Sequence, residues 1–498
     1  MIKPSARRTA ALLLAPAVAA ASATAPAGAA PAAAAPTALT APPAAPPAPR
    51  TQRTRRTQPG PAPGLFKPGA AGVGDPYFPK AGNGGFDVAH YDIALAYAPA
   101  ERRIQGTTRI TATATQDLSR FDLDFLGNKV RSVTVDNVRA TFSRDGQELV
   151  VTPRAGLRKG ARFTVAVTYA GTPPELRDPV LGQTGWITTE DGAITLSQPF
   201  GSASWFPVND HPADKATFSY AIKVPNGLDV VANGEPDGTS TGGRETTFRW
   251  HSDRQMATYL ALVAIGRFEV TDGRSPGGVR VITAVDPAVT PDGEWLQRTT
   301  GEVTDWEAGI FGPFPFGSSG GVVDDAPVGY ALETQNRPTY PGGADTKLIV
   351  HELAHQWFGD SVSLKSWRDI WLNEGFATYA EWLWSEQHGG RSAARQFAEA
   401  YKEPADSPAW RQRTGDPGHD ALFEFFPTYS RGAMLLHMLR TTVGDEKFFK
   451  ILRAWPAEHA QGNATTADFR ALAARISGQK LDRLFETWLY TPGKPDLK

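Results

Sequence analysis

The stretch HELAHQWFGD, residues 351–360, places two histidines four residues apart, with a glutamate directly after the first. On an α-helix, His351 and His355 lie one turn apart on the same face. Both imidazoles can then reach a single metal ion at about 2.0 Å. Glu352, rotated by about 100° from His351, lies beside that ion without being a ligand. The pattern indicates a zinc site, although H-E-x-x-H also occurs by chance on packed helices.

A third candidate ligand lies in WLNEGFATYAEW, residues 371–382. Glu374 follows His355 after a gap of 18 residues and falls in the first turn of a second predicted helix. The helix dipole alone would also favour an acid there. With the two histidines, however, this glutamate completes three protein ligands and leaves a fourth position open to water, as in catalytic zinc sites. The sequence therefore predicts one zinc ion per chain, with Glu352 as the general base of a peptidase.

Groups behind the ligands are expected to orient the imidazoles. Thr378 and Glu381 lie four and seven residues beyond Glu374 and share its helix face, so either could accept an imidazole N–H. Either could equally be an ordinary solvated position. The chain contains no cysteine, so a transition-metal site must use histidine and carboxylate ligands.

Hydrophobic periodicity indicates strands in the first half of the chain. From about residue 80 to 270 the dominant pattern is alternation. In FDLDF, residues 121–125, the apolar side chains face one way and Asp122 and Asp124 the other. This half is predicted to be an all-β, largely antiparallel domain.

Beyond about residue 295 the period becomes helical, with helices expected over 346–358 and from about Trp371 to residue 388. The stretch TDGRSPGG, residues 271–278, is rich in turn residues and marks a plausible boundary. The predicted fold class is multi-domain α+β, with a β domain over 71–275 and a mainly helical zinc metallopeptidase domain over 276–498.

Composition sets the first 70 residues apart. A basic start precedes the apolar run TAALLLAPAVAAASATA, which predicts a signal peptide over residues 1–30 and a secreted protein. The run is short and interrupted by proline, so membrane association is expected only if this segment stays uncleaved. Residues 31–70 are rich in Ala and Pro and then in Arg, a composition that predicts a disordered tether.

Charge is unevenly distributed along the chain. Residues 1–74 carry eight Lys or Arg and no acid, whereas residues 75–498 carry 43 basic and 52 acidic side chains. The part of the chain expected to fold is therefore acidic. Because nucleic-acid-binding domains are typically basic, this balance argues against a nucleic-acid partner.

Five segments together resemble the aminopeptidase N family of zinc metallopeptidases, within the gluzincin group. Besides the two metal-binding stretches, SQPFGSASWFPVNDHPADKATF (197–218) is similar to a family segment of the β domain. GYALETQ (329–335) resembles the exopeptidase motif G-x-M-E-N, and TYSRGA (428–433) resembles Y-x-K-G-A. The resemblance covers about residues 80–498. It implies a saddle-like β sandwich followed by a thermolysin-like catalytic domain.

The resemblance also implies roles for three further residues. Glu333 would bind the free α-amino group of a peptide substrate, helped by Gln198. Tyr429 would donate its hydroxyl to the oxyanion that forms at the scissile carbonyl. The implied activity is removal of the first residue from peptides with a free N-terminus.

This sequence departs from the family pattern in three places. Leu332 and Thr334 replace the Met and Asn of the exopeptidase motif, and Ala203 stands where an Arg is usual. The chain ends soon after the expected catalytic domain, so the resemblance implies a short form without the helical C-terminal domain and with a more open cleft. The sequence predicts neither the oligomeric state nor the preferred side chain.

Two other functions remain open at this point. A thermolysin-type endopeptidase uses the same zinc constellation and needs no amine anchor, so the two peptidases differ at Glu333. A secreted binding module with a silent zinc site is a different class, which an intact Glu352 and Tyr429 make harder to accept.

Overall fold

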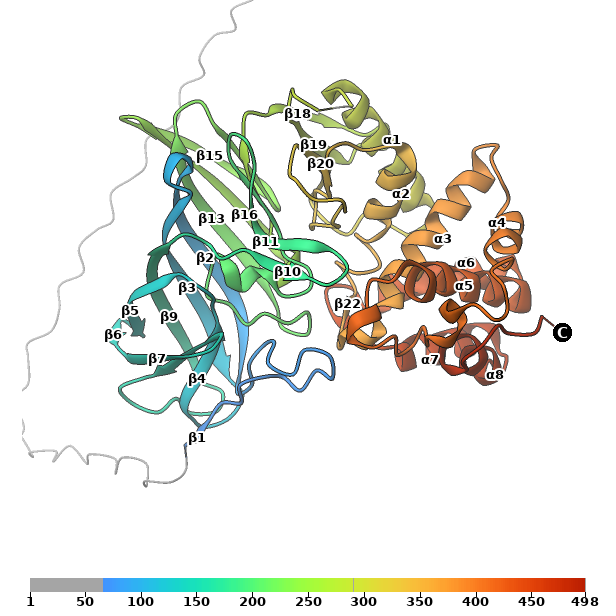
Figure 1. Cartoon of the computed structure of the whole chain (residues 1–498), viewed down its shortest axis with the longest axis horizontal. Helices are drawn as coiled ribbons and strands as arrows, with labels where there is room; N and C mark the ends of the chain where they lie inside the picture. The colour runs from blue at the N-terminus through green and yellow to red at the C-terminus, as the bar shows by residue number, and fades with distance from the viewer. Residues whose placement is uncertain (1–65, 290, 498) are drawn as a thin grey trace, which may run out of the picture. The chain divides into compact units, whose positions relative to one another are not determined.

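The computed structural model describes residues 66–289 and 291–497, which fall within one compact unit. Strands fill the first half of these residues and helices most of the second, as predicted (Figure 1). The predicted signal peptide and most of the predicted tether lie outside the described residues. The tether prediction extended too far, because Lys67–Pro68 already forms a strand, β1, that pairs with β4.

The N-terminal domain contains most of the strands. Their bounds are β1 (Lys67–Pro68), β2 (Phe86–Ala98), β3 (Arg103–Ala114), β4 (Leu118–Asp124), β5 (Lys129–Val135), β6 (Val138–Arg139), β7 (Thr141–Asp145), β8 (Glu148–Thr152), β9 (Arg162–Gly171), β10 (Leu176–Asp178), β11 (Gly182–Thr188), β12 (Ala193–Leu196), β13 (Lys215–Pro225), β14 (Asp229–Ala232), β15 (Glu235–Gly242), β16 (Glu245–Ala257) and β17 (Val263–Gly266).

The second domain has fewer strands and most of the helices. Its strands are β18 (Glu269–Arg274), β19 (Arg280–Val285), β20 (Ser318–Asp324), β21 (Thr339–Pro341), β22 (Ser363–Leu364) and β23 (Asn463–Ala464). Its α-helices are α1 (Gly293–Phe311), α2 (Thr346–Ala354), α3 (Trp371–Gln387), α4 (Ala393–Ala400), α5 (Arg431–Val443), α6 (Asp445–Glu458), α7 (Thr466–Ser477) and α8 (Asp482–Phe485).

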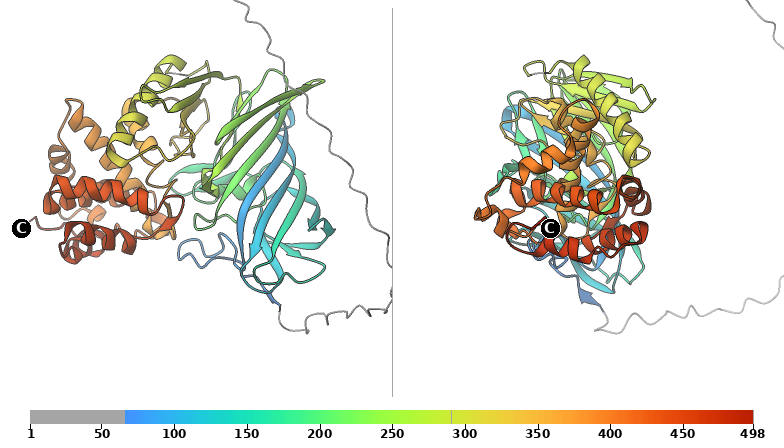
Figure 2. Two further views of the ribbon diagram at one scale, coloured as in Figure 1. Left: turned by 180° about the vertical axis from the view of Figure 1, so that it is seen from behind. Right: turned by 90° about the vertical axis from the view of Figure 1, so that its right-hand side faces the viewer.

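Three sheets contribute to the core of the N-terminal domain: a four-stranded sheet in the order β1-β4-β8-β7 and two others. The larger has eight strands in the order β15-β16-β13-β2-β3-β9-β5-β6, antiparallel except for the parallel pair β13 and β2. The smaller has the order β10-β11-β12-β17-β14. Tyr97 of β2 meets Trp186 of β11 edge to face, with ring centroids 5.1 Å apart, so an aromatic core joins the two sheets. Figure 2 shows the long strands of the larger sheet from behind.

The second domain begins earlier than predicted. The predicted boundary at residue 275 lies inside a hairpin that joins β18 to β19. These strands belong to one sheet with β20 and β21. Residues 275–278 form its tight turn, in which Gly278 N donates to Ser275 O at 3.0 Å, so the turn residues close a hairpin and are not a linker. The boundary therefore precedes β18.

Helix α2 also differs from its prediction, since it ends at Ala354 and not at Phe358. After the C-cap residue His355, the amides of Gln356 and Trp357 donate to carbonyl oxygens three residues back, at 3.0 and 3.1 Å, which tightens the final turn. Just beyond, Lys215 of β13 donates from Nζ to the carbonyl oxygens of Asp360 and Ser361, at 2.7 and 3.0 Å. The N-terminal domain thus fixes the segment in which α2 ends.

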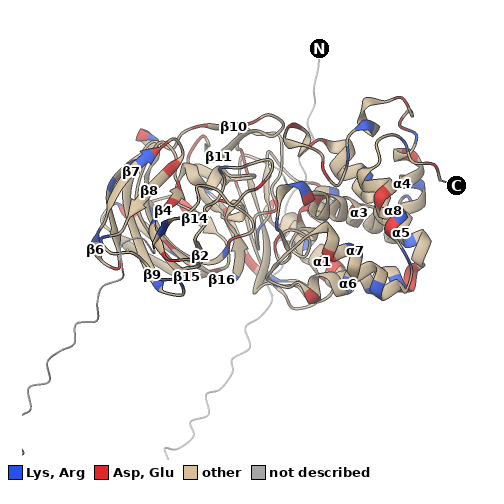
Figure 3. Cartoon of the chain, turned by 90° about the horizontal axis from the view of Figure 1, so that it is seen from below, with Lys and Arg blue, Asp and Glu red and all other residues tan. Residues whose placement is uncertain are grey.

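In the view from below, the positions of acidic and basic residues are interspersed along the ribbon of both domains (Figure 3). Within residues 66–289 and 291–497, no helix combines the length and the apolar character that crossing a bilayer requires.

The N-terminal domain buries carboxylates that the alternating pattern placed opposite the apolar face. Asp122 and Asp124 are buried, because the segments around Gly82 and Asp210 cover that face and donate backbone N–H groups to Asp124 at 3.1 and 2.8 Å. Glu148 lies opposite Asp124 in the β4–β8 pair. Neither oxygen of Glu148 has a donor at normal hydrogen-bond geometry, and burial together with Asp124 raises its pKa to about 8.

This burial predicts a pH-dependent gain in stability for Glu148→Gln. The folded state keeps a proton on Glu148 that the unfolded chain releases above about pH 4.3, so the stability of the wild type falls as pH rises toward 8. The neutral amide removes that loss. We expect the thermal unfolding midpoint of the variant to exceed that of the wild type by about 2 °C at pH 8.5, with no difference near pH 4.5.

The matched control is Glu101→Gln, at an exposed position of the same domain. It should follow the wild type at both pH values. A constant difference between Glu148→Gln and the wild type across the pH range would contradict the assignment.

Candidate metal centre and active site

Helices α2 and α3 bring the three predicted metal ligands together. His351 lies in α2, His355 is its C-cap residue, and Glu374 lies in the first turn of α3. Glu374 Oε2 is 3.3 Å from His351 Nε2 and 3.4 Å from His355 Nε2. All three side chains are buried.

These separations fit zinc. In a tetrahedral site with ligand bonds of about 2.05 Å, the ligand atoms lie about 3.3 Å apart. Two imidazole nitrogens and one carboxylate oxygen are the donor set of catalytic zinc sites, which keep a position open for water or substrate. The residues present therefore fit one zinc ion.

The Nδ1 atoms of both imidazoles have hydrogen-bond partners. Of the two residues predicted for this role, only Glu381 is one of them. His351 Nδ1 lies 2.7 Å from Glu381 Oε1. His355 Nδ1 donates to the carbonyl oxygen of Phe358 at 3.1 Å, because the tightened turn after α2 brings that carbonyl back to the ring. Thr378 does not reach either histidine, and its buried Oγ1 has no hydrogen-bond partner. Both Nε2 atoms are thereby directed toward Glu374.

The predicted amine anchor lies in the same cavity, held by both domains. Glu333 is 2% exposed, and its Oε1 accepts hydrogen bonds from Gln198 Nε2 at 3.1 Å and from Tyr259 OH at 3.0 Å. Carboxylate oxygens of Glu333 and Glu352 lie within 4.8 Å of a ring nitrogen of His355. Tyr259 was missed by sequence reasoning, since it stands in no motif and reaches Glu333 only through the fold.

Tyr429 lies next to the metal ligand His351. It belongs to a π-helix, Phe425–Ser430, that leads into α5. Its ring stacks on His351, with centroids 5.8 Å apart and 20° between the planes. The ring of Phe425, four residues earlier, also stacks on that of Tyr429, with centroids 5.5 Å apart, and is 63% exposed. The predicted oxyanion donor is therefore placed beside the predicted zinc ligands.

Two glycines let the helices carrying Glu374 and Tyr429 approach closely. Gly375 of α3 faces Gly432 of α5, and a Cβ built on Gly432 would lie 2.9 Å from the Cα of Gly375. No side chain fits in this contact. The glycines of the NEG and SRG triplets thus have a packing reason that neither motif reveals by itself.

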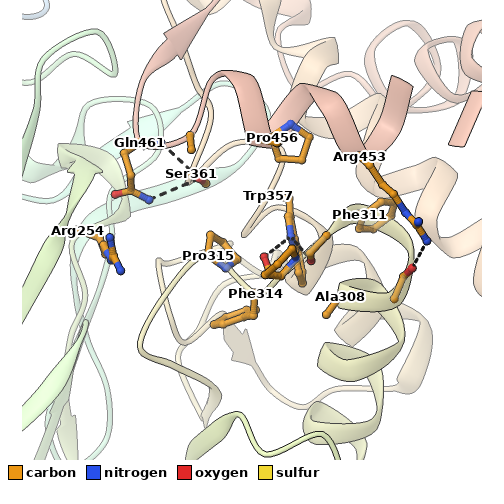
Figure 4. Close-up of a pocket in the computed structure, with 15 residues that line it drawn as sticks. Arg254, Ala308, Phe311, Phe314, Pro315, Trp357, Ser361, Arg453, Pro456 and Gln461 are labelled. Carbon is orange, nitrogen blue, oxygen red and sulfur yellow. Dashed lines mark hydrogen bonds between the residues drawn. The ribbon is translucent and has the colours of Figure 1, made fainter. Parts of the chain in front are cut away.

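One cavity of about 520 Å³ is lined by every predicted site residue except Thr378: His351, His355, Glu374, Glu352, Glu333, Gln198, Tyr429 and Glu381. Its remaining walls, also missed from the sequence, are mostly apolar: Val180, Leu181, Tyr330, Leu348, Phe423 and Phe425. A larger cavity, of about 620 Å³, lies beside Trp357 and is lined by aromatic rings and two arginines, Arg254 and Arg453 (Figure 4). It contains none of the predicted site residues, so size alone does not identify the active site.

Burial dominates the electrostatics of the site. It raises the pKa of Glu333 and raises that of Glu352 to about 7, although nearby imidazoles act in the opposite direction. Burial also acts to raise the pKa of Glu374, but His355 and His351 outweigh it and lower that pKa to about 2. Glu374 is therefore held as a carboxylate, the form that binds a metal.

Two family descriptions match the chain. The Peptidase M1 N-terminal domain matches residues 88–260, and the Peptidase family M1 domain matches residues 332–488. Among curated proteins, "Probable aminopeptidase 2" of Sulfurisphaera tokodaii is 27% identical over 318 residues, covering 58% of this chain and 40% of that protein. "Aminopeptidase 2" of Candida albicans is 26% identical over 450 residues, covering 82% and 47%. The chain thus spans less than half the length of these relatives.

Solved structures match over a larger share. An M1 zinc metallopeptidase variant from Deinococcus radiodurans has a TM-score of 0.78 at 30% identity, covering 85% of this chain and 100% of that one. The family resemblance inferred from the five segments is confirmed. This chain has a β-rich N-terminal domain, a mainly helical catalytic domain and a His-His-Glu metal site, and it matches the two M1 domain descriptions and structures described as M1 zinc metallopeptidases. The chain belongs to the M1 family of zinc metallopeptidases.

Proposed function

We propose that this protein is a zinc aminopeptidase that removes the first residue from peptides with a free N-terminus. The observation that carries the proposal is the position of Glu333. This buried carboxylate lies in the cavity of the metal ligands, and Gln198 and Tyr259 both donate to one of its oxygens. A negative charge fixed near the metal selects peptides in which the residue before the scissile bond carries the free α-ammonium group.

The related proteins support the same activity. Two curated relatives carry the name aminopeptidase. One structure of the Deinococcus radiodurans enzyme is described with the substrate Tyr-Ser-Ala bound. We infer that short peptides are also the substrates of this chain.

Different residues of the site would bind the metal, transfer the proton and stabilise the developing negative charge. Zinc, when bound by His351, His355 and Glu374, would lower the pKa of water and polarise the peptide carbonyl. Glu352 would accept the proton of the attacking water and pass it to the leaving nitrogen, a role typically contributing about 10²- to 10⁴-fold in rate. Tyr429 would donate its hydroxyl to the oxygen on which negative charge develops.

A thermolysin-type endopeptidase is the alternative at this site. It would use the same metal ligands and the same base. It would not need Glu333, the buried acid that two hydrogen-bond donors hold in the cavity. The two activities therefore differ in what Glu333 contributes.

Hydrolysis of aminoacyl arylamides with free or acetylated amines tests the proposal. The zinc-loaded wild type should cleave only the free-amine forms, and Glu333→Ala should lose at least about 100-fold in kcat/KM because the ammonium loses its charged partner. Glu352→Gln should retain zinc and lose nearly all turnover. Glu424→Ala, an exposed acid near the cavity, is the matched control and should keep wild-type rates. Cleavage of acetylated or internal bonds at equal rates by wild type and Glu333→Ala would establish the endopeptidase.

The glycine contact predicts the effect of Gly432→Ala. The added methyl group cannot fit against Gly375, so α5 must move away from α3 and carry Tyr429 with it. We expect kcat to fall at least about tenfold, while metal analysis still finds one zinc per chain. Gly309→Ala is the control, because a Cβ there meets nothing within 4 Å in α1. Wild-type kcat in Gly432→Ala would disprove the positioning of Tyr429 by this contact.

We also propose that the protein is exported and that residues 1–30 are removed. The basic start and short apolar run of the sequence support this. N-terminal sequencing of the protein from a culture that expresses the whole chain should find a first residue close to position 30 in the extracytoplasmic fraction. Intact Met1 in the cytoplasm would refute export.

A further inference from the structure

A second acidic cluster lies apart from the zinc ligands, at the carboxyl ends of two parallel strands. Strands β19 and β20 pair with Val285 opposite Val323, so Asp286 and Asp324 follow side by side. Asp325 is the next residue in the chain. One carboxylate oxygen from each of the three lies within 4.8 Å of the others.

Asp324 is buried in this cluster, and its hydrogen-bonding neighbour is another acid, Asp325. Its side chain is 2% exposed, and no N–H donor and no basic group among the described residues contacts its carboxylate. After burial itself, which raises the pKa of Asp324 to about 8, the groups that act on it are all acids, including Asp325, Asp286 and Asp191. A buried carboxylate in such surroundings requires either a proton or a cation.

The other two carboxylates are also arranged for a ligand. Asp325 has a buried Oδ1 with no hydrogen-bond partner among the described residues. Asp286 Oδ1 accepts a hydrogen bond from the backbone N–H of Ala288 at 2.8 Å, which fixes this side chain in the loop after β19. Asp286 is thus held by the backbone, and among the described residues none of the three carboxylates forms an ion pair with a basic side chain.

We infer that Asp286, Asp324 and Asp325 bind a calcium ion. Carboxylate oxygens are hard ligands, and Ca²⁺ accepts them at about 2.3–2.6 Å in flexible arrangements, so oxygens on opposite sides of the ion are about 4.8 Å apart. Mg²⁺ requires bonds of about 2.0–2.1 Å in nearly ideal octahedral geometry and keeps much of its water. A site that offers several carboxylate oxygens from the protein itself therefore suits calcium better than magnesium.

The location links this ion to the active site. From Asp325 the chain runs directly into residues 329–331, which line the catalytic cavity, and then to Glu333. Calcium bound to Asp325 would hold the start of this segment against the sheet that contains β19 and β20. The binding site itself does not depend on the proposed peptidase activity.

The test uses the full chain with zinc bound, dialysed into buffer that contains zinc and no other divalent ion. Calcium chloride is titrated by calorimetry, and the thermal unfolding midpoint is measured with and without about 5 mM Ca²⁺. We expect one calcium per chain and a midpoint rise of about 2 °C or more in the wild type.

Asp324→Asn separates calcium binding from damage to the fold. The amide removes one negative charge, so calcium should bind at least tenfold more weakly. In calcium-free buffer the same variant should unfold at a higher temperature than the wild type, because repulsion within the cluster is reduced. Asp406→Asn, at an exposed acid of the same domain, should respond to calcium as the wild type does.

Three results would overturn the inference. They are an absence of saturable calcium binding in the wild type, an equal calcium response in Asp324→Asn, and a response to Mg²⁺ without one to Ca²⁺. The first would mean that a shared proton, and not a cation, neutralises the cluster.

Discussion

Three buried carboxylates share one cavity wall, and the need to compensate their charge is the constraint on which the rest of the active site depends. Glu333, Glu352 and Glu374 are each at most 5% exposed. Like charges so poorly hydrated repel one another and favour protonation. Each therefore needs its own support: imidazoles beside Glu374, two hydrogen-bond donors on Glu333, and the charge of a metal for the group as a whole. Two helices and both domains converge on this cavity to provide that support.

The sequence predicts best those features that one helix or one strand determines. His351, His355 and Glu374 could be assigned because helical spacing alone brings the two histidines together and a following helix starts at the acid. By contrast, Tyr259 contacts Glu333 across 74 residues of chain, and Lys215 contacts Asp360 across 145. Such partners are brought together only by tertiary packing, so no local pattern identifies them.

What the local patterns could not determine has a related physical cause. Periodicity indicates which side chains share a face, but not what covers that face, and Asp122 and Asp124 are buried because distant loops pack over them. Thr378 shares the face of Glu374, yet a backbone carbonyl is closer to the imidazole that it was expected to orient. Turn residues likewise indicate a bend without showing whether it closes a hairpin or separates two domains, as at Ser275.

The shared cavity also limits how this gene could recombine. Gln198 and Tyr259 belong to the β-rich domain, whereas Glu333 and the metal ligands belong to the helical domain. A fragment encoding only the helical domain would encode every zinc ligand but neither donor that holds Glu333. A chimera with a foreign β-rich domain would keep its hydrolytic centre and Glu333, but the hydrogen bonds that hold Glu333 would depend on the new parent. Under the proposed activity, the carboxylate that selects the substrate's end and the two donors that hold it in place are thus encoded in separate stretches of one reading frame.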